Sequence, residues 1–316
     1  MACLVRVAPS VAAAIGVGVS LTQVTRWNRS RWVAILQSLT PAIALSGVPV
    51  ALIGVRRRHP LLAAAGATTA AVLGAVVVPA MRSSTGGDGG SDGLSIAHCN
   101  MLYLNVDRSA DLAAALLDLG ADVLAMSEFT EHHCRALIAA DALAQYPHWV
   151  GRAARRSEGI VIWSRYPISE VSLAPLDTRP GIVATIDGPA GPMRIVLAHP
   201  DPPTMARGLA SWEPSLDLIG SIGASAGPPT VIVADLNASR WHPVLRRLLG
   251  RGWRDAHELA GRGLSTSWPT DRRLPPFIRL DHALLRGDVE LLDIFDFDAP
   301  GSDHRGFVVT VSPGSR

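Results

Sequence analysis

The stretch TVIVADLN, residues 230–237, joins an apolar run to two polar residues at its end. Val, Ile and Thr favour strands, and a run without polar alternation indicates a strand buried on both faces. Asp235 and Asn237 end this predicted strand, where an α/β scaffold holds functional side chains in fixed positions. The stretch therefore predicts an α/β domain with a polar site at one edge of a sheet.

The chain around this stretch alternates apolar runs with helical patterns. Strands are predicted at 94–100, 122–128, 159–164, 181–187, 193–199, 230–237, 277–285 and 305–311, and helices at 110–120, 135–144, 205–224 and 241–250. Several strands follow one another without a helix between them. This order favours two packed sheets covered by helices over a simple doubly wound sheet.

Polar residues of catalytic type recur at the ends of these strands. They are Asn100, Glu128, His199, Asp235, Asn237, Asp281, Asp303 and His304. Most have an ordinary structural explanation: amides cap turns, acids suit helix N-termini, and the Gly-Ser-Asp of 301–303 is typical of a turn. Asp281 is harder to explain in this way, because the predicted strand around it is apolar and burying an unpaired carboxylate is costly.

The first 82 residues differ in charge from the rest of the chain. All 29 basic residues are Arg; eight of them lie in residues 1–82, which contain none of the 27 acidic residues. The remaining 21 Arg and 27 acids give residues 83–316 a net charge of −6. A buried soluble bundle of this size, the alternative to a membrane region, would rarely lack acidic residues altogether.

Three uncharged stretches, 7–25, 32–55 and 60–81, are each long enough to cross a hydrocarbon core of about 30 Å. A cleaved signal peptide is the alternative for the first stretch only. We therefore predict a membrane region at 1–82 with three helices, a flexible linker at 83–93 and a catalytic domain at 94–316. Three spans place the N-terminus and the domain on opposite faces. Arg56–Arg58 favour a cytoplasmic turn, whereas Arg26, Arg29 and Arg31 in the preceding loop favour the opposite orientation. The compact triple tips the balance toward an extracytoplasmic domain in the cell membrane.

The sequence segments that contain these polar residues give them a common interpretation. IAHCNMLYLN, VLAMSEFT, GIVIWSRYPI, VLAHPDPP, VIVADLNAS, LSTSWP, RLDHALL and GSDHRGF, spanning 94–311, resemble the endonuclease/exonuclease/phosphatase superfamily. The resemblance implies the DNase I-like fold, a four-layer α/β sandwich of two mixed sheets flanked by helices. The preceding membrane helices further resemble a bacterial membrane-anchored branch related to glycopeptide-resistance proteins.

The resemblance also implies a role for each residue of the site. Glu128 and Asn100 would hold Mg²⁺, with Mn²⁺ as the alternative, and Asp303 would join them. Asp235 would activate the attacking water, and Asn237 would donate a hydrogen bond to the phosphoryl oxygens. His304, oriented by Asp281, and His199 would contact the phosphate, in keeping with the use of histidine as a positioned proton donor.

Three classes of function fit these expectations. The first is a membrane-anchored phosphohydrolase acting on a phosphorylated, lipid-linked substrate such as a cell-wall lipid intermediate, with the bilayer as its partner. The second is a nuclease with the same site, which the charge of −6 and the absence of Lys make less favoured. The third is a non-catalytic membrane binding protein. The sequence leaves open the choice among monoester, diester and pyrophosphate, and the oligomeric state.

Overall fold

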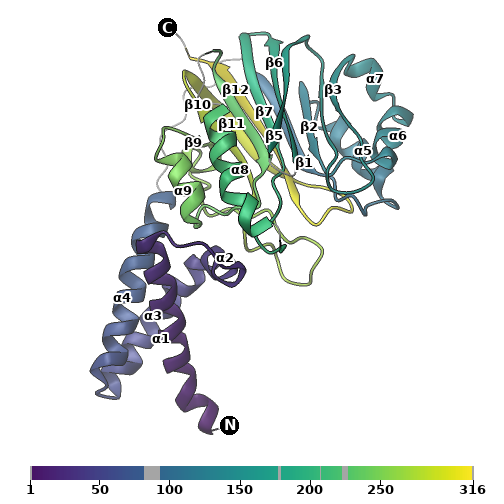
Figure 1. Cartoon of the computed structure of the whole chain (residues 1–316). Helices are drawn as coiled ribbons and strands as arrows, with labels where there is room; N and C mark the ends of the chain where they lie inside the picture. Colours follow the sequence, from purple (N-terminus) through teal and green to yellow (C-terminus); the bar gives the residue numbers. More distant parts are fainter. Residues whose placement is uncertain (1, 82–92, 177–178, 207, 223–226, 315–316) are drawn as a thin grey trace.

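The computed structural model describes residues 2–81, 93–176, 179–206, 208–222 and 227–314, and it has two regions (Figure 1). Four helices form the N-terminal region, and two sheets with their covering helices form the domain that follows. Residues 83–92 of the predicted linker lie outside the described ranges. The placing of the membrane region, linker and domain boundaries otherwise stays a prediction.

The N-terminal region is built from α1 (Ala2–Thr25), α2 (Arg31–Ser38), α3 (Thr40–Arg56) and α4 (Pro60–Val77), followed by the short η1 (Val78–Met81). In Figure 1, α1, α3 and α4 run side by side away from the domain, and α2 lies to the side of the upper end of this bundle, beneath the domain. Glycines allow α3 and α4 to approach closely. A Cβ added to Gly66 would lie 2.3 Å from the backbone nitrogen of Ala51 on the facing helix.

Two of these helices, Val7–Thr25 and Pro60–Met81, are long and apolar enough to cross a membrane. The continuous span predicted at 32–55 is instead divided into α2 and α3, which meet at 73°. The division has a local cause: Pro41 has no N–H to donate to the carbonyl of Gln37. The hydroxyl of Thr40 donates to that carbonyl at 2.7 Å, and the helix turns at Leu39.

The domain contains two mixed six-stranded sheets. The first has the order β11-β12-β1-β2-β4-β3, from β1 (Leu94–Asn100), β2 (Val123–Ser127), β3 (His148–Arg152), β4 (Ile160–Ser164), β11 (Val289–Asp298) and β12 (Arg305–Pro313). The second has the order β5-β6-β7-β8-β10-β9, from β5 (Ile168–Leu176), β6 (Arg179–Gly188), β7 (Gly191–Ala198), β8 (Thr230–Asp235), β9 (Arg254–Asp255) and β10 (Asp281–Arg286). Parallel pairing joins β1 to β2 and β7 to β8; the other pairs are antiparallel.

Side-chain alternation explains how the sheets stack. On β2, Val123 and Ala125 belong to the core between the two sheets, whereas Leu124 and Met126 face the opposite side. That side is covered by α5 (Ser109–Asp118), α6 (Glu131–Ala139) and α7 (Ala142–Gln145). The outer face of the second sheet is covered by α8 (Gly208–Ile222) and α9 (Pro243–Leu249), while α10 (Ala256–Leu259) packs near β10. The predicted four-layer α/β sandwich is confirmed.

Several boundaries differ from those expected. The helix predicted at 135–144 is two helices, α6 and α7, and the strands β3, β5, β9 and β11 were not predicted. The strand predicted at 277–285 begins only at Asp281, so Asp281 and His282 open β10 instead of lying inside it. Residues 277–280 form a loop segment that bridges to Trp268 through Ile278. This shift places Asp281 directly opposite Asp235 in the register of β8 and β10.

Candidate active site

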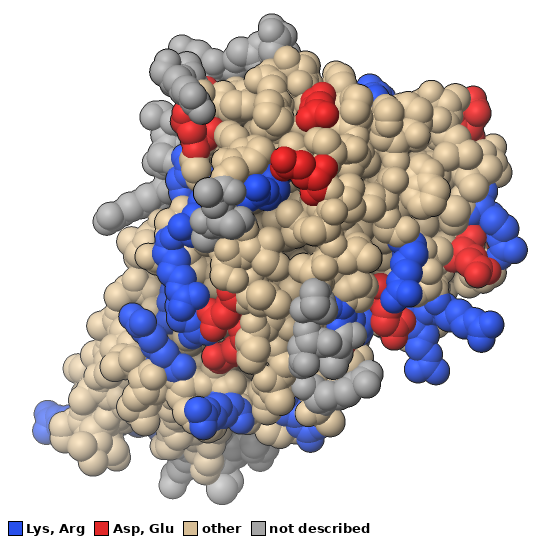
Figure 2. All heavy atoms as spheres, turned by 45° about the horizontal axis from the view of Figure 1, so that its top comes forward, with Lys and Arg blue, Asp and Glu red and all other residues tan. Residues whose placement is uncertain are grey.

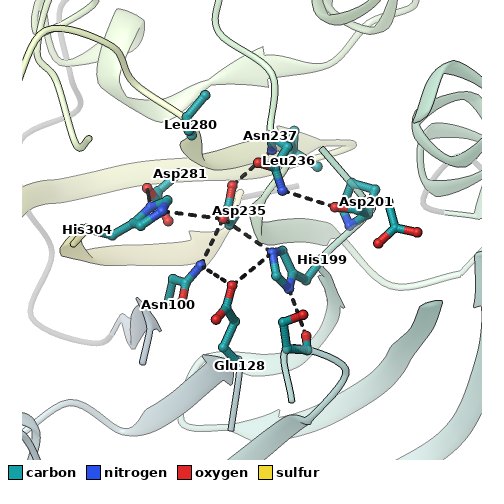
Figure 3. A network of polar contacts seen from close by, with 12 residues as sticks. Asn100, Glu128, His199, Asp201, Asp235, Leu236, Asn237, Leu280, Asp281 and His304 are labelled. Carbon is teal, nitrogen blue, oxygen red and sulfur yellow. Dashed lines mark hydrogen bonds and ion pairs between the residues drawn. The ribbon is translucent and has the colours of Figure 1, made fainter. Parts of the chain in front are cut away.

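The topology brings the predicted site residues together at one edge of the two sheets (Figure 3). Parallel strands end at the same edge, so Asn100 at the end of β1 lies beside Glu128, which follows β2. His199 follows β7, and Asp235 ends the neighbouring parallel strand β8. The antiparallel strands β10 and β12 begin at this edge, with Asp281 as the first residue of β10 and His304 directly before β12.

Asp235 lies at the centre of the cluster and is buried. Its Oδ2 accepts from the side-chain amide of Asn100 at 3.0 Å, and its Oδ1 accepts from the backbone N–H of Asn237 at 2.9 Å. The Nε2 atoms of His199 and His304 lie 3.4 and 3.8 Å from Oδ2. Burial raises the pKa of Asp235, but the two histidines and the hydrogen bonds outweigh burial and hold this pKa well below its usual range. Asp235 is therefore ionised at neutral pH.

His304 forms a buried pair with Asp281. Its Nδ1 donates to Oδ2 of Asp281 at 2.8 Å, so its Nε2 is directed toward Asp235. Burial opposes the charged imidazolium, but Asp281, Asp235 and Asp303 outweigh it and raise the pKa of His304 to about 10. Asp281 therefore holds the ring of His304 in one orientation, with a charged hydrogen-bond donor directed at the site.

His199 and Glu128 complete the near side of the cluster. Nδ1 of His199 lies 3.3 Å from the backbone oxygen of Ser157, and Nε2 lies 3.7 Å from Oε1 of Glu128. Burial lowers the pKa of His199, but Asp235 and Glu128 overcome it, and the net pKa is raised. Glu128 has a φ of 54°, a left-handed conformation that costs energy outside glycine and turns the chain abruptly after β2. The backbone N–H of Tyr103 donates to Oε2 of Glu128 at 3.0 Å and fixes this carboxylate.

The oxygen donors at the site suit a hard divalent cation. Glu128 and Asp303 are partly exposed and both open into one pocket, where a Mg²⁺ ion could keep most of its water or phosphate ligands. Asn100 directs its amide N–H groups at Glu128 and Asp235, and its Oδ1 accepts from the N–H of Leu102. Asn100 thus holds the two carboxylates in place here, and its role as a metal ligand stays a prediction.

A second group of metal-ligand type lies deeper. Asp235, Asp281 and His304 offer ligand atoms within 4.8 Å of one another. The hydrogen bond between Asp281 and Nδ1 of His304 already engages two of these groups. The more open Glu128 is therefore better placed to hold a cation, and the contact of His304 with phosphate stays a prediction.

Sequence reasoning gave no role to several supporting residues. Ser267 donates to Oδ2 of Asp281 at 2.6 Å, and its oxygen accepts from the N–H of Leu280 at 3.0 Å. His98 is fully buried, with Nδ1 3.8 Å from Oδ1 of Asp281. Ser267 lies in LSTSWP, one of the segments that carry the family resemblance. The sequence of this segment does not indicate that Ser267 is a hydrogen-bond partner of Asp281.

The site lies at one end of a pocket of about 600 Å³. Seven of the eight predicted residues line it: Asn100, Glu128, His199, Asp235, Asn237, Asp303 and His304. Asp281 lies behind His304, fully buried. Arg179, in a buried ion pair with Asp201, lines the pocket as well and was not predicted. The lining also includes Ala34, Ile35, Ser38 and Leu39, which come from the N-terminal helices.

Comparison with known proteins assigns the family. The sequence model of the Endonuclease/Exonuclease/phosphatase family matches residues 97–304, so the chain belongs to this family. Members are divalent-metal-dependent hydrolases of phosphoester bonds, among them phosphodiesterases, nucleases and phosphatases. The comparison with curated proteins gives no match.

Solved structures agree on the fold. A humanized TDP2 from D. rerio superposes with a TM-score of 0.60 at 17% identity, covering 70% of this chain and 100% of that one. The endonuclease/exonuclease/phosphatase from Beutenbergia cavernae gives 0.57 at 17% identity, covering 71% and 72%. The corresponding protein from Bacteroides vulgatus gives 0.57 at 17% identity, covering 70% and 99%. At these identities the likeness concerns the fold alone, and the glycopeptide-resistance branch stays a prediction.

Proposed function

We propose that this protein is a membrane-anchored, Mg²⁺-dependent phosphohydrolase that cleaves a phosphate ester or pyrophosphate bond of a lipid-linked, cell-envelope substrate. One observation carries the proposal: a phosphohydrolase site lies at the floor of a pocket whose wall includes a helix from the apolar N-terminal region. We further propose that the domain is extracytoplasmic, on the charge pattern around Arg56–Arg58.

The residues of the site divide the chemistry among themselves. Asp235, ionised and hydrogen-bonded on both oxygens, accepts a hydrogen bond from the attacking water and aims it at phosphorus. The charged His304 and the histidine His199 donate to the phosphoryl oxygens as negative charge grows on them. Asn237 lines the same pocket with an amide for those oxygens. A Mg²⁺ ion held by Glu128, with Asp303 and Asn100 as the other predicted ligands, would neutralise phosphate charge.

A nuclease with the same site is the alternative. One of the structurally similar proteins, a TDP2 from D. rerio, was solved with a single-strand DNA product, but at 16% identity the likeness extends to the fold only. The net charge of −6 on residues 83–316 opposes binding to a phosphate backbone. Figure 2 shows Arg side chains in separate groups with acidic side chains among them on the visible face.

The test uses the full chain in detergent with Mg²⁺ and three substrates: a prenyl pyrophosphate, a phospholipid and DNA. We expect phosphate or headgroup release from a lipid substrate, loss of this release in EDTA, and its recovery when Mg²⁺ or Mn²⁺ is added back. Asp235→Ala should lower the rate about 1,000-fold or more.

Rapid cleavage of DNA without lipid turnover would assign the nuclease function instead. If Asp235→Ala left the turnover of all three substrates unchanged, the domain would be a non-catalytic binding module.

A further inference from the structure

The pocket above Asp235 has two chemically different ends. The charged and amide side chains of the site form one part of its lining, called here the floor. The other part, called here the apolar end, consists of apolar residues from three separate segments: Ala34, Ile35 and Leu39 of the N-terminal region, Pro202, Pro203 and Met205 after β7, and Phe277, Ile278 and Leu280 before β10. A substrate that fills the pocket therefore has its phosphate and an apolar group next to each other.

Each of the three segments leaves a large apolar side chain exposed. Ile35, Met205 and Phe277 are 37%, 48% and 47% exposed, respectively. Removing such a side chain from water is favourable, in proportion to the apolar area that becomes buried. A hydrocarbon group bound in this part of the pocket would remove apolar surface of these side chains from water, whereas hydroxyls placed there would lose hydrogen bonds to water.

The helix that carries Ile35 is held firmly at this place. His242 of the domain, whose Nδ1 accepts from the backbone N–H of Ser239 at 2.8 Å, directs Nε2 at the carbonyl of Ala34 at 2.9 Å. Gln23 on α1 donates to the carbonyl of the adjacent Trp241 at 3.0 Å. These contacts join the apolar N-terminal region to the catalytic domain beside the pocket, where α2 departs by 73° from the direction of α3.

We propose that the apolar end of the pocket is a subsite for the hydrocarbon chain of the substrate, with α2 as its wall and Ile35 as its central contact. The inference rests on the proposed function and specifies it: the hydrocarbon chain of the substrate is attached directly to the phosphate or pyrophosphate that is cleaved at the site. This hydrocarbon chain passes between α2 and the segment 277–280 and continues toward the N-terminal helices from which α2 comes.

The first experiment compares two allylic substrates that differ only in the length of the hydrocarbon chain, dimethylallyl pyrophosphate and farnesyl pyrophosphate, with the full-length protein in lipid nanodiscs. We expect kcat/KM to favour farnesyl pyrophosphate by at least about tenfold, the range that a few methylene groups supply in an apolar pocket. Ile35→Asp should reduce this ratio to about one, and Ile35→Leu should preserve it. Ile138→Asp is the matched control, because Ile138 is an isoleucine on α6 that is 47% exposed and does not line the pocket.

The second experiment measures binding without turnover, so that the subsite can be tested even if hydrolysis fails. Calorimetry in Mg²⁺ should show dodecylphosphonate binding at least about tenfold more tightly than methylphosphonate, and Ile35→Asp should abolish the difference while Ile138→Asp retains it. Equal affinities in the unchanged protein, or a preference that survives Ile35→Asp, would overturn the subsite. A preference for the longer hydrocarbon chain without hydrolysis of any lipid phosphate ester or pyrophosphate would uphold the subsite and refute the proposed function.

Discussion

Asp281 is the residue on which the electrostatics of the site depend most. It accepts hydrogen bonds from His304 at 2.8 Å and from Ser267 at 2.6 Å, and it is fully buried. Asp281→Asn keeps the shape but removes the charge that fixes His304 as an imidazolium, so kcat should fall by about 100-fold or more. Steady-state kinetics on the lipid substrate checks this, and KM should change little.

A second variant distinguishes the effect of the Asp281 charge on His304 from an effect on the stability of the fold. Ser267→Ala removes one hydrogen bond to the same carboxylate but leaves its charge, so its kcat should fall by about tenfold only. Both variants should retain the thermal midpoint of the unchanged protein within a few degrees. A kcat for Asp281→Asn within twofold of the original would show that the pair with His304 has no part in the reaction.

At the scale of elements, the close packing of α3 against α4 depends on glycine. The position of a Cβ on Gly66 is already filled by the backbone of α3, whereas a Cβ on Gly74 of the same helix meets nothing within 4 Å. Gly66→Ala should therefore force the helices apart and lower the thermal midpoint by several degrees, and Gly74→Ala should leave it unchanged or raised slightly. Thermal unfolding of the two variants in the same detergent tests this, and equal midpoints would contradict the packing.

The elements also show what the sequence can and cannot predict. Buried strands such as β2 and β8 can be predicted because a short continuous apolar run indicates a buried strand whichever strand pairs with it. The strand β11 was not predicted because its acidic residues interrupt the alternation of apolar and polar residues typical of a strand. Its pairing with β12 becomes evident only in the structure. The break at Leu39 was not predicted because Pro41 is also tolerated inside membrane-spanning helices and need not divide them. Ser267 acquires its role only when the fold brings it to Asp281. Tertiary contacts, which the local sequence does not encode, therefore decide β11 and Ser267, whereas the break has a local cause.

At the scale of the whole molecule, His242 connects the two regions and makes their junction sensitive to acid. Burial lowers the pKa of His242 to about 4, below the value of 6.5 for an unperturbed histidine. Between these values the unfolded chain binds a proton that the folded chain excludes, so stability is lost as pH falls from 6.5 toward 4. This one group should account for about 2 kcal/mol of the unfolding free energy lost between pH 7 and pH 5.

Denaturant unfolding of the full chain at these two pH values measures the loss. His242→Gln should lose less on acidification, by about the amount given above, because the amide does not titrate in this range. His132→Gln, a change at an exposed histidine on α6, should behave like the unchanged protein. An identical pH dependence in all three proteins would show that the junction does not titrate through His242.

The 73° bend between α2 and α3 at Leu39 also affects where the active site stands relative to the apolar helices. Because α2 is hydrogen-bonded to the domain through Ala34 and is followed by α3 of the apolar bundle, the position of Asp235 relative to that bundle is fixed. If the bundle spans the membrane as we propose, Asp235 stands at a set distance from the bilayer surface. On the proposed function, this distance determines which phosphate the enzyme cleaves. The enzyme cleaves the phosphate nearest the bilayer surface, and a phosphate held farther out by a bulky sugar does not reach Asp235.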